Sequence, residues 1–213
     1  MPRNEQVSGL NIPKLESVAA DRPASVVPKE QSNKGFEHIH KKLKKCLYLY
    51  LGETPARGLG VFTAKAFAAG DIVLIDEDGD YYQDVMTYEE LCRHGHSLDI
   101  TLQVGRDAFK LPTGSPEDFT NHSCEPNTGI RLTPKGTIIV ALRDIAVHEE
   151  LTYDYSTYLD NPYESMRCLC GAPGCRGVVG NFNDLPAGLR QRYRALGIVG
   201  RFVDRLPSAD VAD

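Results

Sequence analysis

Three cysteines toward the C-terminal end of the chain have the spacing of a metal site. Cys168, Cys170 and Cys175 form a C-x-C-x4-C pattern within RCLCGAPGCRG (167–177), whose glycine and proline residues permit tight turns around an ion. The first residues lack the apolar segment of a secretory signal, so we expect thiolates that bind zinc rather than disulfides. Four thiolates would close the tetrahedral shell of zinc, which predicts a structural role for the ion.

Three other cysteines are candidates for the fourth zinc ligand. Cys46 begins a predicted strand, and Cys92 lies in a predicted helix that would bury it, so both are expected to be small core residues. Cys124 lies in a polar stretch, DFTNHSCEPNTGIRL (118–132), between two strand-like segments. A cysteine hydrolase with His122 as base and Cys124 as nucleophile is an alternative. Residues two apart on a strand rarely reach hydrogen-bond geometry, however, and a zinc thiolate is not a free nucleophile.

Two further stretches carry residue types suited to binding or catalysis. ARGLGVF (56–62) has two glycines that allow a backbone to approach a ligand closely and an arginine that adds positive charge, although a strand-entry turn would look the same. In HEELTYDYSTY (148–158), alternation along an extended segment would place Tyr153 and Tyr155 on one face and Asp154 on the other. Two phenols would then line one slot, although tyrosine pairs on strands more often pack in a core.

Charge is divided unevenly along the chain. Of the 24 Lys/Arg and 29 Asp/Glu among 213 residues, nine basic and five acidic ones lie in residues 1–45, which leaves an acidic body. An acidic body disfavours direct binding to nucleic acid and favours basic peptides, although a negative surface also serves solubility. The sequence has no apolar run of eighteen residues, so no association with a membrane is expected.

Short apolar runs bounded by glycine, proline and polar residues predict a mainly β fold, of the β-rich α+β class. The runs lie at 46–52, 60–67, 71–77 and 136–145. Two segments have a helical pattern: 87–95, with Thr87 as N-cap, and 185–197, with Gly197 as the stop. The elements expected to position the polar stretches are therefore strands and the turns between them.

Five motifs in this order resemble those of the SET-domain protein lysine methyltransferases. RGLGVF resembles the family's N-terminal loop, GDIVLIDEDGD with TYEELCRHG its strand and helix block, and FTNHSCEPNT its central NHSCxPN motif. RDIAVHEELTYDY is similar to its GEELTYDY motif, and RCLCGAPGCRG to its post-SET cysteine cluster. The resemblance runs from about Lys45 to Asn183. It implies the SET fold of small sheets, in which the NHSC segment threads beneath the segment carrying EELTYDY as a pseudoknot.

The resemblance also divides the chain. It implies a SET domain at 45–157 and a post-SET zinc segment at 166–182, followed by a C-terminal helix and tail at 183–213. Residues 1–34 are polar without an apolar period and are expected to form a disordered tail. The basic cluster at 40–46 is expected to be a solvated strand edge or helix end. No cysteine-rich pre-SET module is expected.

A role for each matching residue follows from the resemblance. S-adenosylmethionine (SAM) is the methyl donor of the family, and Tyr155 and Tyr153 would be the catalytic residues. The residues expected to hold SAM are Arg57, Gly58, Leu59, Asn121, His122 and Tyr155. The zinc ligands would be Cys124, Cys168, Cys170 and Cys175, which makes Cys124 the missing fourth ligand.

The reaction explains why aromatic residues suit such a site. Methyl transfer needs a neutral amine, whereas a free lysine, with a pKa of about 10.4, is protonated at neutral pH. Desolvation in a narrow aromatic channel lowers the pKa of that lysine, so no strong general base is required. By resemblance, Tyr155 orients the amine. Tyr153 stands at the family's Phe/Tyr switch, where a phenol holds a water near the amine and favours monomethylation.

Three positions depart from the family pattern. Glu77 stands where a substrate-channel tyrosine is usual, unless Tyr81 or Tyr82 takes that place. Asp118 replaces a common arginine, and His148 replaces a glycine and would be strained if its φ is positive.

The function implied by the resemblance is SAM-dependent lysine N-methylation of a histone tail or another basic protein. An alternative is a catalytically silent SET-like module that binds SAM and zinc. The protein is expected inside the cell: nuclear or cytoplasmic in a eukaryote, and cytoplasmic or delivered to a host in a bacterium.

Overall fold

A computed structural model describes residues 48–77, 81–162 and 165–204. The predicted tail at 1–34, the basic cluster at 40–46 and Cys46 lie outside the described residues. The described part is built mainly of short strands, as predicted from the sequence.

The first sheet joins segments that are far apart in the sequence. It has the order β1-β2-β10-β7, with β1 at Leu49–Thr54, β2 at Gly58–Thr63, β10 at Glu150–Tyr153 and β7 at Asn121–His122. β1 and β2 form an antiparallel hairpin, and β10 pairs with β2 antiparallel. The pairing of β10 with β7 is parallel. This sheet therefore brings three of the sequence motifs together.

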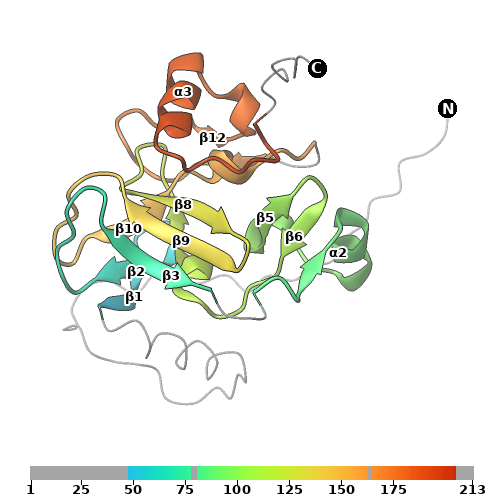
Figure 1. Cartoon of the computed structure of the whole chain (residues 1–213), viewed down its shortest axis with the longest axis horizontal. Helices are drawn as coiled ribbons and strands as arrows, with labels where there is room; N and C mark the ends of the chain where they lie inside the picture. Colours follow the sequence, from blue (N-terminus) through green and yellow to red (C-terminus); the bar gives the residue numbers. More distant parts are fainter. Residues whose placement is uncertain (1–47, 78–80, 163–164, 205–213) are drawn as a thin grey trace, which may run out of the picture. The chain divides into compact units, whose positions relative to one another are not determined.

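Two three-stranded sheets make up most of the remaining β structure (Figure 1). In the first, β3 (Ile72–Asp76), β9 (Gly136–Ala141) and β8 (Thr128–Thr133) pair antiparallel in that order. In the second, β4 (Val85–Met86), β6 (Ala108–Lys110) and β5 (Leu102–Gly105) do the same. A short ladder joins β11 (Met166–Arg167) to β12 (Val178–Val179).

Helix α2 (Tyr88–His94) forms where the sequence predicted it. The side chain of Thr87 accepts a hydrogen bond from the backbone N–H of Glu90, whose own side chain returns to Thr87 in a capping box. Gly95 ends the helix in the left-handed region, with φ of 73°. The expectation that this helix buries Cys92 is wrong, because Leu91 is the residue turned inward and Cys92, one residue later, is exposed.

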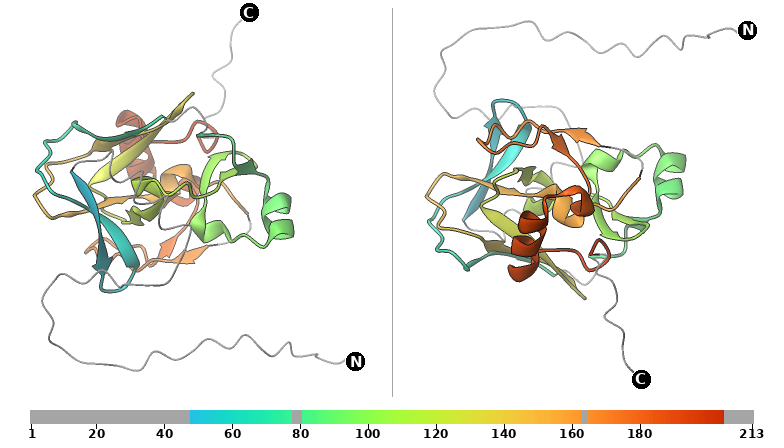
Figure 2. Two further views of the ribbon diagram at one scale, coloured as in Figure 1. Left: turned by 90° about the horizontal axis from the view of Figure 1, so that it is seen from below. Right: turned by 90° about the horizontal axis from the view of Figure 1, so that it is seen from above.

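Helix α3 (Ala187–Ala195) also agrees with its prediction, and Gly197 follows it with φ of 65°. It packs against β9 and contributes to a small core of its own (Figures 1 and 2). The residues of this core are Val140, Phe182, Leu185, Tyr193, Ile198 and Val203. Four short 3-10 helices complete the described elements: η1 (Leu98–Ile100), η2 (Pro116–Phe119), η3 (Tyr155–Tyr158) and η4 (Phe182–Asp184).

The larger core fills the space between the first two sheets. Most of its buried members come from β1, β2, β3, β8, β9 and β10, and they include Val61, Ile130, Ile139 and Leu151. Tyr153 belongs to this core at the end of β10. The tyrosine pair of the sequence motif therefore stands on a packed support, which holds the phenol rings in a fixed orientation.

Gly129 on β8 packs directly against Ile198 of the C-terminal segment. A Cβ atom at this position would lie 2.5 Å from Cγ2 of Ile198. We therefore expect Gly129→Ala to lower the free energy of unfolding by about 1–3 kcal/mol through overpacking. Gly188→Ala in α3 is the matched control, because no atom lies within 4 Å of its Cβ and the change stabilises a helix by up to about 1 kcal/mol. Urea unfolding of both variants measures the difference.

Candidate active site and zinc centre

The NHSC segment and the TYDY segment lie side by side in the structure. In the parallel ladder of β7 and β10, Asn121 is opposite Thr152, and His122 is opposite Tyr153. The backbone N–H of Ser123 donates to the carbonyl of Tyr153 at 3.0 Å, which extends the pairing past the end of β7. Residues 31 positions apart in the sequence are thereby paired in one register.

The rings of Tyr153 and Tyr155 lie together, with centroids 4.6 Å apart and planes inclined by 39°. The expected alternation along one extended strand is wrong in detail, because β10 ends at Tyr153 and Tyr155 begins the 3-10 helix η3. The hydroxyl of Tyr155 donates to the carbonyl of Thr120 at 3.0 Å. Burial raises the pKa of Tyr155 to about 12, so its hydroxyl keeps its proton at neutral pH and acts as a donor.

His122 connects this tyrosine to the cysteines. Its Nδ1 accepts a hydrogen bond from the backbone N–H of Tyr155 at 3.2 Å, and its Nε2 lies 3.4 Å from Sγ of Cys124. Burial lowers the pKa of His122 to about 4, so the ring is neutral and Nε2 carries the proton. The expectation that residues two apart would not meet is wrong here, because β7 ends at His122 and the chain turns before Cys124.

A network of charged and polar side chains connects the loop at Arg57 with β7 and β10. The Glu150 carboxylate accepts from the guanidinium of Arg57 at 2.6 Å and from the side-chain amide of Asn121 at 2.9 Å. Arg57 also donates to the carbonyl of His122 at 3.1 Å, and Asn121 donates to the carbonyl of Leu59 at 3.0 Å. Four of the predicted SAM-binding residues are thus joined through one carboxylate that the sequence analysis did not single out.

Strand β2, which directly follows Arg57, requires its two glycines, Gly58 and Gly60. Gly58 has φ of 70°, and a Cβ there would meet no atom within 4 Å, so its backbone faces open space. Gly60 is crowded instead, since a Cβ would lie 2.6 Å from the Glu150 carboxylate and 2.9 Å from the Asn121 amide. Open backbone on one side and a polar network on the other suit a small polar ligand.

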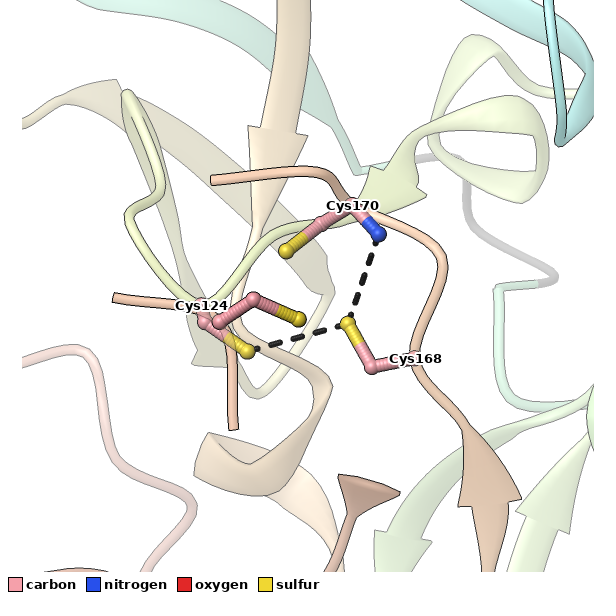
Figure 3. Close-up of side chains that lie close together, drawn as sticks. Cys124, Cys168 and Cys170 are labelled. Atoms are coloured by element: carbon pink, nitrogen blue, oxygen red, sulfur yellow. Dashed lines mark hydrogen bonds between the residues drawn. The ribbon is translucent and has the colours of Figure 1, made fainter. Parts of the chain in front are cut away.

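Cys124, Cys168, Cys170 and Cys175 form a cluster in which the four sulfur atoms all lie within 4.8 Å of one another. Figure 3 shows the sulfur atoms of three of them turned toward a common centre. The sulfurs of Cys124 and Cys168 are 3.7 Å apart, close to the edge of about 3.8 Å that a tetrahedron with Zn–S bonds of 2.3 Å requires. The donor set and spacing therefore fit a structural zinc ion, with Cys124 as the fourth ligand.

A buried carboxylate that sequence reasoning missed ties the zinc segment to the rest of the site. Asp154 is fully buried and accepts from the guanidinium of Arg176 at 2.7 Å and the hydroxyl of Tyr193 at 3.0 Å. The backbone N–H of Arg176 points at Sγ of Cys124 at 3.4 Å. From the TYDY motif, the sequence predicted only that Asp154 faces away from the two tyrosines. The partners of Asp154 come from distant segments and have no local signal.

The residues that depart from the family pattern have distinct environments. Glu77 accepts a hydrogen bond from the hydroxyl of Thr133 at 2.8 Å, at the end of β3. Tyr81 is buried against Glu117, and Tyr82 donates to the carbonyl of Thr133 at 2.6 Å. Within the part of the chain that the structure describes, His148 is the one non-glycine residue with positive φ, at 64°. Its backbone is therefore strained, as the sequence suggested.

Comparison with known proteins places these observations in context. Residues 58–156 match the family model of the SET domain. The chain is 36% identical over 155 residues to histone-lysine N-methyltransferase ATX2 of Arabidopsis thaliana, covering 67% of this chain and 14% of that protein. It is 48% identical over 129 residues to the H3 lysine-4 specific histone-lysine N-methyltransferase of Debaryomyces hansenii, covering 56% of this chain and 12% of that protein.

The crystal structure of Arabidopsis thaliana SUVH6 in complex with SAM resembles the fold with a TM-score of 0.50 and 20% identity, over 62% of this chain and 32% of that one. That likeness confirms the predicted fold of small sheets. The chain spans 14% or less of the length of the two curated relatives. Among the described residues, the helices are too short or too polar to cross a lipid bilayer.

Proposed function

We propose that this chain, whose residues 58–156 match the SET-domain family model, is a protein lysine N-methyltransferase that transfers a methyl group from SAM to a basic protein. The observation that carries the proposal is the parallel pairing of Asn121–His122 with Thr152–Tyr153. This pairing brings the polar loop, the paired phenols and the zinc cluster into contact within one site. Both curated relatives described above are histone-lysine N-methyltransferases, which makes a histone tail the leading candidate substrate.

Two of the predicted SAM-binding residues, Arg57 and Asn121, contact the Glu150 carboxylate. Arg57, Asn121 and the backbone at 58–59 would hold SAM, with His122 supporting it through its backbone and Tyr155 at the reacting end. Hydrogen bonds from Asn121 to Glu150 and to the carbonyl of Leu59 support this assignment, because they fix the Asn121 side chain beside the backbone at 58–59. When bound, SAM supplies an activated methyl group on a sulfonium.

The chain's own residues prepare the lysine. The buried ring of Tyr153 and the partly buried ring of Tyr155 exclude water from the amine, and desolvation lowers the pKa of a lysine held beside them. Tyr155 keeps its proton and is held by the carbonyl of Thr120, so its role is to position the amine rather than to remove a proton. The predicted domain bounds, a SET domain at 45–157 and a zinc segment at 166–182, are consistent with this division of roles. A histone substrate would make the nucleus the place of action.

Intact-protein mass spectrometry of core histones incubated with the zinc-loaded protein and SAM tests the proposal. We expect one histone to gain about 14 Da per methyl group, the net mass of CH2 that is added when CH3 replaces a hydrogen. Tyr155→Phe serves as the blank. A protein that binds SAM but leaves every histone and basic test protein unchanged would instead be a silent binding module.

We predict that the product is mainly monomethyllysine and that Tyr153→Phe raises the share of di- and trimethyllysine. Tyr153 is 8% exposed and packs beside Tyr155, so the phenol leaves little room for added methyl groups. Removing one hydroxyl frees space and releases any water bound to it. Mass spectrometry of the product peptide, with wild type and variant at equal turnover, measures the shift. A wild-type product that is mostly trimethyllysine would contradict this prediction.

A further inference from the structure

A small cavity beside the tyrosine pair has acidic walls. The cavity is about 40 Å³, and Tyr153 and Tyr155 line it together with Glu117 and Asp118. A single water needs roughly 10–15 Å³, so the space admits a water or an amine head group but no ring. Ile130 and the segment 99–102 close the remaining sides. Carboxylates at this depth need a partner, because burying an isolated charge is costly.

Glu117 already has its partners. Lys110, whose side chain is 1% exposed, lies 3.0 Å from Oε1 of Glu117, which is itself 3% exposed. The hydroxyl of Tyr81 donates to the same oxygen at 2.7 Å, and the hydroxyl of Thr137 donates to the other. Glu117 therefore has donors on both oxygens, and Lys110 lies closer to it than to Asp118.

Asp118 is different, because only one of its oxygens is satisfied. Oδ2 accepts the backbone N–H groups of Thr113, Gly114 and Ser115, at 2.8, 2.7 and 3.0 Å. Within the described residues, Oδ1 has no hydrogen-bond donor, and the nearest cation, Nζ of Lys110, is 3.7 Å away. The side chain is 9% exposed. Asp118 lines the cavity, and one of its carboxylate oxygens thus keeps its acceptor capacity unused.

Building on the proposed function, we propose that Oδ1 of Asp118 binds the ammonium group of the target lysine and selects amines that still carry N–H. Two carboxylates and one lysine leave a net negative charge in a buried place, and an entering ammonium compensates it. Burial raises the pKa of Asp118 and Lys110 lowers it, so a second cation would favour the ionised form. The contact acts while the lysine is protonated, in binding rather than in methyl transfer. Trimethyllysine, which has no N–H, cannot make it.

Asp118→Asn tests the contact with little change of shape, since the amide oxygen still accepts the three backbone N–H groups. The probes are a histone H3 N-terminal peptide containing lysine 4 and the same peptide with norleucine at that position, measured by fluorescence anisotropy. We expect the wild type to prefer the lysine peptide and the variant to reduce that preference by about tenfold. Glu89→Gln is the control, because it removes the same charge from an 84% exposed side chain on α2 and is expected to leave the preference unchanged.

An unchanged preference in Asp118→Asn would overturn the inference, as would a wild type that binds both peptides equally. A second measurement needs no variant: the wild type should bind the trimethyllysine form of the peptide about tenfold more weakly than the lysine form, at equal net charge. Equal binding of these two would also overturn the inference. Histone methylation by the wild type is measured separately, so a failure of the Asp118 contact is distinguished from a failure of the proposed function.

Discussion

Tyr155→Phe should lower the rate constant of methyl transfer by about 100-fold or more and leave the affinity for SAM within a factor of about two. The hydroxyl of Tyr155 donates to the carbonyl of Thr120, which fixes the ring beside Tyr153. Without this hydrogen bond the ring loses its anchor, and a small displacement of the amine is enough to slow transfer strongly. Single-turnover kinetics measure the rate constant, and calorimetric titration with SAM measures the affinity.

Tyr158→Phe is the matched control for this prediction. Tyr158 belongs to the same 3-10 helix and also loses a hydroxyl that donates to a backbone carbonyl, that of Ile130 at 2.9 Å. Its ring lies in the core and does not line the small cavity beside Tyr153. We expect this variant to lose about 1 kcal/mol of stability and to retain its transfer rate. Equal loss of activity in both variants would mean that the effect is structural, and full activity in Tyr155→Phe would refute the assignment.

The sequence predicted the elements that depend on local chemistry. Thr87, Glu90 and Gly95 lie within one helix and its caps, so their pattern was readable and α2 formed as expected. The cysteine spacing also carried its own signal, because three of the four thiols lie within eight residues. The fourth, Cys124, is 44 residues from Cys168, and only resemblance to a family assigned it.

What the sequence did not predict depends on contacts between distant segments. Glu150 lies in the motif that was singled out for its tyrosines, and nothing in the sequence indicated that it binds Arg57, 93 residues earlier. Arg176 was a flanking residue of the cysteine cluster, and its pairing with Asp154 depends on the folded arrangement. The burial of Lys110 with Glu117 also had no sequence signal, since lysine and glutamate are ordinarily exposed. Such pairs can be recognised only when the fold brings them together.

Removal of zinc should have the largest effect on stability. Apart from the pairing of Arg176 with Asp154, the segment around the cluster has little else to hold it, since β11 and β12 are two residues each and their small core contains Cys124, Cys168 and Val179. Apparent binding energies of structural zinc reach about 10–16 kcal/mol in zinc-finger peptides, so a folded segment without the ion is not expected. Chelation should therefore lower the melting temperature and abolish methyl transfer, because Cys124 is two residues from His122.

Thiol alkylation followed by mass spectrometry measures this loss directly. With zinc bound, the four clustered cysteines should resist alkylation, and Cys92, which is exposed on α2, should react at once. After chelation the four should react as well, while the reactivity of Cys92 is unchanged, so that it serves as an internal control.

Cys175→Ser should reproduce the loss of stability and activity, whereas Cys92→Ser should leave both intact. Protection that does not depend on the chelator would overturn the zinc assignment and return Cys124 to consideration as a free thiol beside His122, 3.4 Å away. Because His122 also accepts the backbone N–H of Tyr155, loss of the ion should disturb Tyr155 through the imidazole ring of His122.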